Sequence, residues 1–240
     1  MAIVLEQLIE PKRVCSYLPD RRAQLEMRIQ VEVTATELEA MLERGWRRFG
    51  PVYFRPACQT CESCVSLRIP VDTFLPTKSQ RRALKGTLRL RRTVGLPRVD
   101  DEHMRLYRRW HAERERSRGW EPSPLDAERY AFDFAFPHPA VREVSYRDPG
   151  DQRLVAVGIC DETEAALSAA YFYWDPACAP SSLGVGHVVM LIADAKKAGC
   201  KHVYLGYRVL ECASLAYKAR YEPHELLAGR PQADELPNWR

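Results

Sequence analysis

The chain has 240 residues, enough for one large domain or two small ones around a substantial core. A composition of 46% hydrophobic and 28% charged residues with a net charge of +4 is ordinary for a soluble protein. No stretch is long and apolar enough to cross a membrane and the N-terminus lacks a basic leader, so we expect a cytoplasmic protein without a membrane partner.

The N-terminal half begins with a predicted strand at residues 23–33, where apolar and polar residues alternate. Thr36 and Glu39 have the spacing of a capping box, which predicts a short helix that ends at Gly45. The other elements expected here are strands at 53–55 and 66–71 and a helix or extended basic segment at 79–91.

The C-terminal half begins after a boundary predicted at residues 95–97, with a helix at 101–116. Ser123 and Asp126 are expected to cap a second helix, with Pro124 at its first position. The remaining elements are a hairpin of strands at 153–160 and 167–174, a helix opened by Gly184 and Gly186 and ended by Gly199, and a strand at 201–207.

This order of elements predicts an α/β (α+β) sandwich of the acyltransferase type rather than a doubly wound sheet. We expect an N-terminal cysteine-containing domain at 1–97 and a GNAT-like acyltransferase domain at 98–240.

A tight cysteine cluster, Cys58-x-x-Cys61-x-x-Cys64, lies in the N-terminal half. Three thiolates at this spacing favour a metal site, and Cys15 is the only other cysteine in this half that could be a fourth ligand. Zinc or an iron–sulfur cluster would accept these ligands. The alternative is that the thiols serve as small apolar residues.

A basic stretch follows the cysteines: residues 78–92 carry seven Lys and Arg and no acidic residue. Such a local excess favours a phosphate-bearing partner over a merely solvated helix face. Lys78, Arg81 and Arg82 are the candidate nucleic-acid contacts.

The helix opened by Gly184 and Gly186 could hold an anion, because backbone N–H groups at a helix N-terminus face outward and glycine permits close approach. His187 follows them, and we interpret it as a packed residue rather than a base. Beyond the last strand, Lys218 and Arg220 could also bind an anion, or could simply end a surface helix.

Several motifs in chain order resemble those of bacterial aminoacyl-tRNA–protein transferases. They are Cys15-Ser-Tyr-Leu-Pro19, Gly45-Trp-Arg-Arg48, Phe54-Arg-Pro-x-Cys58 with the cysteine cluster, Leu67-Arg-Ile-Pro-Val71, Ser79-Gln-Arg-Arg82, Tyr204-Leu-Gly-Tyr207 and Ala216-Tyr-Lys-Ala-Arg-Tyr221. Within that family the chain is most similar to the aspartate/glutamate leucyltransferases, relatives of eukaryotic arginyltransferases. It departs from the usual pattern at Arg208, in the linker 209–215 and at His187.

The resemblance implies transfer of leucine from leucyl-tRNA to an N-terminal Asp or Glu of acceptor proteins, which marks them for N-end rule degradation. No cofactor is then needed for the chemistry, because the donor ester is already activated and an α-amine needs little deprotonation. Tyr207 and Tyr217 are the candidate catalytic residues. Lys218 and Arg220 are the candidate contacts to the acceptor's carboxylate, and the basic stretch would bind tRNA.

Three alternatives stay open at this point. One is an arginyl donor, and another is an acetyl-CoA-dependent acetyltransferase with the same fold. The third is a non-catalytic, metal-braced RNA-binding protein. The oligomeric state is left open.

Overall fold

The computed structural model describes residues 1–119, 122 and 126–240. The strands are β1 Ile3–Ile9, β2 Arg13–Val14, β3 Arg22–Ala23, β4 Leu25–Val31, β5 Arg47–Phe49, β6 Val52–Pro56, β7 Val65–Pro70, β8 Arg91–Gly95, β9 Val141–Arg147, β10 Leu154–Glu162, β11 Ala166–Trp174, β12 His202–Arg208 and β13 Glu225–Leu226. The helices are α1 Ala35–Glu43, α2 Lys78–Thr87, α3 Asp101–Arg118, α4 Ala127–Phe134, α5 Leu183–Lys197 and α6 Ala213–Ala216, with 3-10 turns η1 Pro176–Ser181 and η2 Tyr217–Arg220.

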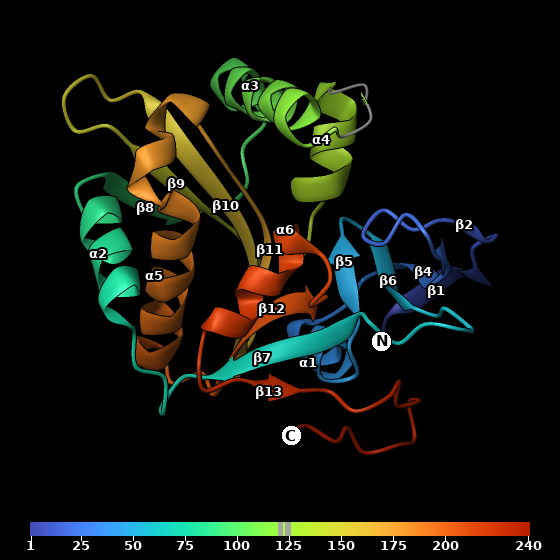
Figure 1. The fold of residues 1–240 in the computed structure, drawn as a ribbon. Coiled ribbons are helices and arrows are strands. Elements are labelled where there is room, and N and C mark those ends of the chain that lie inside the picture. The colour runs from blue at the N-terminus through green and yellow to red at the C-terminus, as the bar shows by residue number, and fades with distance from the viewer. Residues whose placement is uncertain (120–121, 123–125) are drawn as a thin grey trace.

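Two larger sheets organise the molecule (Figure 1). The N-terminal sheet is antiparallel with the order β1-β4-β6-β5, and the other has the order β13-β7-β12-β11-β10-β9-β8. Helices α2 and α5 pack on one face of the seven-stranded sheet, while α3 and α4 pack on the other. This arrangement confirms the predicted α/β sandwich of the acyltransferase type.

The seven-stranded sheet takes strands from both halves of the chain. Strands β7 and β8 precede residue 97, yet β7 pairs with β12 and β8 pairs with β9. Helix α2 packs on α5 in the same body. The division predicted between residues 97 and 98 therefore does not coincide with the division between the sheets, which comes just before β7. Hydrophobic patterning along the chain cannot indicate which sheet a strand joins.

Helix α1 begins two residues earlier than predicted. Thr34 is its N-cap and shares a capping box with Glu37, so the predicted pair of Thr36 and Glu39 is wrong. Both pairs have the same spacing, but only Thr34 has the extended backbone that an N-cap requires. Gly45 follows the helix with φ of 80° and confirms the predicted end.

The predicted elements of the C-terminal half are confirmed with small changes in their bounds. Helices α3 and α5, the hairpin of β10 and β11, and strand β12 all lie where expected. Asp126 caps α4 through the backbone N–H of Arg129, whereas Ser123 and Pro124 lie outside the described residues. In the described part of the chain, no helix combines the length and apolar character needed to span a bilayer.

Strand β9 was missed because its sequence carries Arg142, Glu143, Ser145 and Arg147. Glu143 is nevertheless 2% exposed and binds Nε2 of His103 at 3.1 Å. A hydrogen bond to a distant residue therefore allows this polar side chain to be buried in the strand, and the sequence pattern does not show that contact.

Candidate active site

The strands β11 and β12 separate part-way along their length. They pair in parallel only from Ala166 opposite His202 to Ser168 opposite Tyr204. Beyond that point β11 continues along β10 to Trp174, and β12 continues along β7 to Arg208. Their facing edges are therefore free of each other's hydrogen bonds, which leaves a wedge that side chains from elsewhere can enter.

Arg47 enters this wedge from β5. It follows Gly45, whose turn directs the chain from α1 into the strand, and its guanidinium donates to the carbonyl of Ala169 in β11. Arg47 is 9% exposed, and its second terminal nitrogen is buried without a hydrogen-bond partner. Because buried donors are nearly always hydrogen-bonded, this unpaired nitrogen indicates that a ligand supplies the acceptor.

Lys218 lies beside Arg47. A Cβ placed on Gly206 would be 3.4 Å from Nε of Arg47 and 3.6 Å from Nζ of Lys218. Gly206 sits at a bulge of β12 with φ of 76°, a left-handed conformation that suits glycine. Nζ of Lys218 donates to the carbonyl of Tyr207 at 3.0 Å. The left-handed backbone thus accounts for the glycine, and both cations lie directly beside it.

No ion pair holds Arg47 or Lys218 among the described residues. Asp161, a nearby carboxylate, is bound by Arg48. Burial and the charge of Arg47 lower the pKa of Lys218 to about 7. Burial also lowers the pKa of Arg47. Two uncompensated cations in a half-buried wedge form a ready-made site for a carboxylate or an oxyanion.

Tyr207 was predicted to be catalytic, and the structure gives it an anchoring position instead. Its hydroxyl donates toward the carbonyls of Gly45 at 3.0 Å and Phe54 at 3.2 Å. Burial raises the pKa of this hydroxyl well above its usual range. The phenol therefore ties β12 to the N-terminal sheet, and its predicted catalytic role stays a prediction.

Tyr217 and Arg220 flank Lys218 in η2. Tyr217 is 39% exposed and Arg220 is exposed, and the backbone carbonyl of Arg220 accepts a hydrogen bond from Gln80 of α2. Of the two cations predicted beyond Gly206, Lys218 is the one that the structure places with Arg47 beside that glycine.

Gly184 and Gly186 lie at the start of α5 as predicted, but helix packing explains why position 186 is a glycine. A Cβ on Gly186 would lie 2.0 Å from Oγ1 of Thr87 and 2.8 Å from the carbonyl of Ala83. The glycine therefore lets α5 touch α2, rather than letting a ligand approach. Gly184 has only ordinary contacts with Phe172 and Trp174, so its predicted role in binding an anion stays a prediction.

His187 confirms the packed interpretation. It is 1% exposed, its ring stacks on Phe172 at a centroid distance of 4.3 Å, and Tyr146 hydrogen bonds its Nδ1 at 2.9 Å. Burial, followed by the charge of Arg92, lowers its pKa to about 3, so this histidine is neutral.

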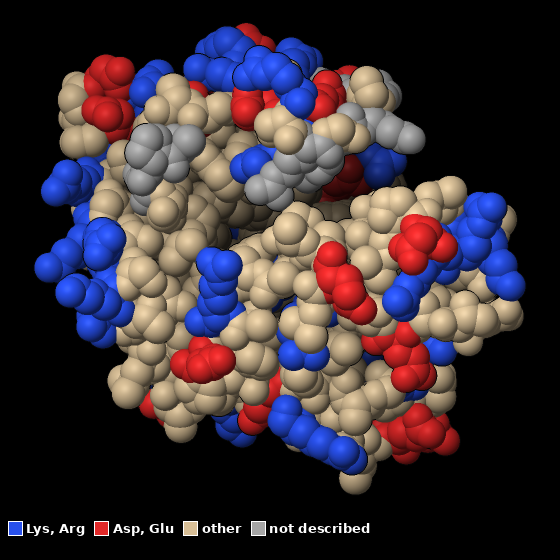
Figure 2. All heavy atoms as spheres, in the orientation of Figure 1, with Lys and Arg blue, Asp and Glu red and all other residues tan. Residues whose placement is uncertain are grey.

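The basic stretch forms an exposed face of α2. Lys78, Arg81 and Arg82 are all exposed there, as Figure 2 shows over the position of α2. Figure 2 also shows Lys and Arg gathered over α3. The predicted tRNA contacts are thus available to a partner.

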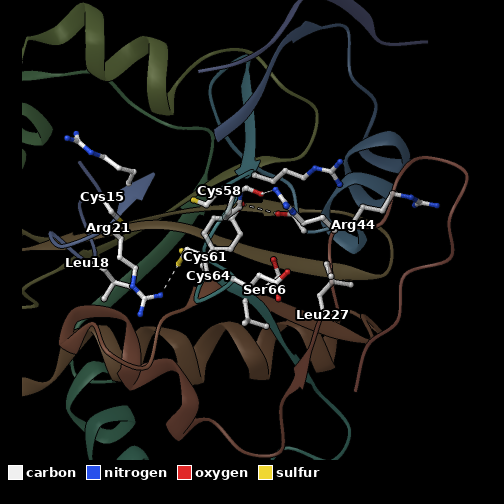
Figure 3. Close-up of a pocket in the computed structure, with 18 residues that line it drawn as sticks. Cys15, Leu18, Arg21, Arg44, Cys58, Cys61, Cys64, Ser66 and Leu227 are labelled. Atoms are coloured by element: carbon white, nitrogen blue, oxygen red, sulfur yellow. Dashed lines mark hydrogen bonds between the residues drawn. The ribbon is translucent and has the colours of Figure 1, made fainter. Parts of the chain in front are cut away.

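The four cysteines predicted as metal ligands line one pocket (Figure 3). Cys61 accepts a hydrogen bond from Arg21 at 3.3 Å, and Cys212 packs against the same cluster. Yet no three Cys, His, Asp or Glu side chains of the described residues are grouped so that they could hold a metal ion. As placed, the thiols do not form a site for zinc or an iron–sulfur cluster, and such binding stays a prediction that metal analysis of the purified protein tests.

Comparisons with known proteins cover nearly the whole chain. A family model described as the N terminus of arginine-tRNA-protein transferase matches residues 13–82, and one for its C terminus matches residues 102–228. The chain belongs to the aminoacyl-tRNA–protein transferase family. This confirms the resemblance drawn from the motifs.

Curated relatives in this family carry a leucyltransferase name. "Aspartate/glutamate leucyltransferase" of Helicobacter hepaticus is 33% identical over 98% of this chain and 97% of its own. The protein of the same name from Halorhodospira halophila is 34% identical over 90% of this chain and 91% of its own. Among solved structures, L-PGS from Bacillus licheniformis covers 62% of this chain and 48% of its own at 16% identity, with a TM-score of 0.42.

Arg47 is the site residue that the sequence did not single out. It was noted only as part of the Gly45–Arg48 motif. The sequence offered one signal for it. Two arginines precede Phe49 in a short strand, and because side chains alternate between the faces of a strand, one of the two arginines can face the protein interior. Nothing in the sequence relates Arg47 to Lys218, which lies 171 positions later.

Proposed function

We propose that this protein is an aminoacyltransferase that moves leucine from leucyl-tRNA to an N-terminal Asp or Glu of acceptor proteins. Family membership and the printed names of relatives matched over nearly their full lengths support the reaction. The observation that carries the acceptor preference is the half-buried pair of Arg47 and Lys218, which no carboxylate of the described residues neutralises.

The reaction needs little from the enzyme beyond positioning. The acceptor's α-amine nitrogen forms a bond to the ester carbonyl carbon, the bond from that carbon to the ribose oxygen breaks, and the ribose oxygen takes the proton. The products are an amide and uncharged tRNA. Because the ester is activated, holding the amine against it supplies most of the rate.

The acceptor's acidic side chain meets Lys218 and Arg47 in this proposal. A carboxylate there satisfies the free terminal N–H of Arg47 and neutralises the repulsion between the two cations. An uncharged Asn or Gln would leave one of them unpaired, which costs more in a buried site than on the surface. The proposal thus explains selection by charge rather than by size.

The experiment compares peptides that begin with Glu, Gln or Ala, together with leucyl-tRNA and the variants Lys218→Met and Arg220→Met. We expect wild-type protein to extend the Glu peptide. Lys218→Met should lower kcat/KM for that peptide by about tenfold or more, and Arg220→Met should change it little, because the Arg220 side chain is exposed to solvent. If the Ala peptide reacts as fast as the Glu peptide in wild-type protein, the assignment is wrong.

The tRNA partner is assigned to α2 and its surroundings by charge. Duplex phosphates attract clustered Lys and Arg, and α2 presents Lys78, Arg81 and Arg82 on one exposed face. The tRNA body would then lie along this face while its charged end reaches the wedge between β11 and β12.

A further inference from the structure

Helix α3 carries a row of exposed arginines, the α3 stripe, which takes no part in the cation pair of the wedge. Its members are Arg105, Arg108, Arg109 and Arg116, and Asp101 is the one exposed acidic residue among the side chains described on this helix. Arg105, Arg109 and Arg116 are spaced so that they share one helix face over a length of roughly 16 Å. Figure 2 shows Lys and Arg gathered over α3. Such a row of like charges fits a partner with repeated anionic groups, such as the phosphates of a nucleic acid.

The α3 stripe is fastened to the end of β11, where the wedge opens. Nη1 of Arg109 lies 3.3 Å from Oδ2 of Asp175, the residue directly after β11. The next residue of α3, Trp110, packs on Trp174, the last residue of β11, with ring centroids 3.8 Å apart. The guanidinium of Arg114 lies 3.7 Å from the centroid of the Trp110 ring. These contacts hold the stripe at the mouth of the wedge.

Positive charge is in excess at this mouth. Asp175 is 2% exposed and binds Arg153 as well as Arg109, so one carboxylate faces two guanidinium groups. Arg105 has neither a hydrogen bond nor an ion pair with any residue that the structure describes. An anionic partner can therefore bind here without displacing the ion pairs that hold the helix.

The part of β11 that has left β12 adds aromatic surface beside this charge. The paired residues 166–168 are buried, whereas Tyr171, Phe172 and Trp174 are half-buried. Unpaired bases offer faces that can stack on aromatic rings, which the bases of a duplex do not. Arginines next to aromatic side chains thus favour a single strand over a duplex.

The mouth and the acceptor site lie on the same strand. Ala169, whose carbonyl binds Arg47, is five residues before Trp174, which is roughly 17 Å along β11. A strand that enters at Trp174 and follows β11 would therefore end beside the cation pair.

We infer that the α3 stripe and the free part of β11 bind the unpaired 3′ end of the aminoacyl-tRNA. The arginines hold its phosphates, and the half-buried aromatic side chains of β11 lie beside its bases. The inference rests on the proposed function and adds the surface that guides the charged end into the wedge, while α2 holds the tRNA body. The acceptor protein fits the stripe less well, because Arg47 and Lys218 already match its one acidic N-terminal side chain.

The test compares two RNA hairpins at low salt by fluorescence anisotropy, one that ends in the unpaired tRNA sequence CCA and one trimmed to a blunt end. Wild-type protein should bind the first about tenfold more tightly. Arg105→Glu combined with Arg116→Glu should abolish this advantage. The matched control, Lys78→Glu with Arg81→Glu on α2, makes the same charge change and should weaken both hairpins while it keeps their ratio. Because each result is a ratio, a partly unfolded sample does not alter it.

A third hairpin with an abasic overhang separates phosphates from bases. It should recover only part of the advantage, and full recovery would exclude the aromatic side chains of β11 from the contact. An unchanged ratio in the α3 variant would overturn the inference, and a raised KM for the acceptor protein in that variant would assign the stripe to the acceptor instead. Failure of wild-type protein to transfer leucine to a Glu peptide would reject the proposed function, whatever the hairpins show.

Discussion

At the scale of single residues, the site depends on charges that are buried together. Arg47 donates to Ala169 and Lys218 donates to Tyr207, so each cation is held by a strand of the wedge. Desolvation makes such a pair unfavourable without an anion, which is why the pair indicates a ligand rather than a structural bridge. The predicted Arg220 lacks this property because water solvates it.

Gly206→Ala should reduce transfer activity by more than its loss of unfolding free energy alone would explain. A left-handed alanine costs roughly 1–2 kcal/mol, and its methyl group would touch both Arg47 and Lys218. Gly199→Ala is the matched control, since φ there is 79° and a Cβ meets nothing within 4 Å. We expect both variants to lose similar free energy of unfolding in urea, and only Gly206→Ala to lose transfer to a Glu peptide. Equal transfer by the two variants would contradict this site.

At the scale of elements, the contact of α5 with α2 explains a glycine that sequence reasoning had interpreted as a ligand contact. Gly186 lies against Ala83 and Thr87, so its missing side chain sets how closely the two helices pack. The basic face of α2 is held on the sheet by the same contact.

Gly186→Ala should therefore destabilise the protein by about 1–3 kcal/mol, because the new methyl group would overlap the backbone of α2. Gly184→Ala, whose methyl group would lie 3.7 Å from Trp174, should change the free energy of unfolding by less than about 1 kcal/mol. Thermal and urea unfolding compare the two variants. Full stability of both, combined with loss of transfer in both, would restore the anion-site interpretation.

The exposed face of α2 gives a second prediction at this scale. Reversal of Lys78, Arg81 and Arg82 to Glu should weaken binding of tRNA and reduce the slope of log affinity against log salt, by roughly 0.9 for each lost duplex phosphate contact. Reversal of the exposed Lys12, Arg13 and Arg129 on other elements is the charge-matched control. Filter binding over a range of salt concentrations measures both, and equal slopes for the two triple variants would exclude α2 as the contact.

At the scale of the whole molecule, the C-terminal tail fastens the two sheets together. Trp239 donates to the carbonyl of Glu43 at 3.0 Å and lies 4.4 Å from the guanidinium of Arg68, while Arg44 and Arg55 hold the residues before it. The tail thereby also closes one side of the pocket that the cysteines line.

Trp239→Ala should lower the free energy of unfolding by about 2 kcal/mol, since it removes a partly buried aromatic ring, a hydrogen bond and a cation–π contact. Leu236→Ala, nearby but 90% exposed, should cost nearly nothing. Urea unfolding followed by circular dichroism provides the comparison. A negligible loss in Trp239→Ala would mean that the tail does not brace the sheets.

The sequence by itself determined the local elements and the family. Alternation, capping residues and glycines placed most helices and strands, because these signals act between residues a few positions apart. The ordered motifs indicated the transferase family without any geometry. The capping-box pattern predicted the start of α1 two residues too late, because Thr36 and Glu39 have the same spacing as the true pair, Thr34 and Glu37.

Only the tertiary structure decided which residues form the site. Arg47 and Lys218 meet because β5 and η2 converge where β11 and β12 part, and no short-range signal encodes that meeting. The assignment of β7 to the larger sheet, the packing role of Gly186 and the buried hydroxyl of Tyr207 have the same origin. Each depends on desolvation and contact between segments far apart in the chain, which residue order alone does not contain.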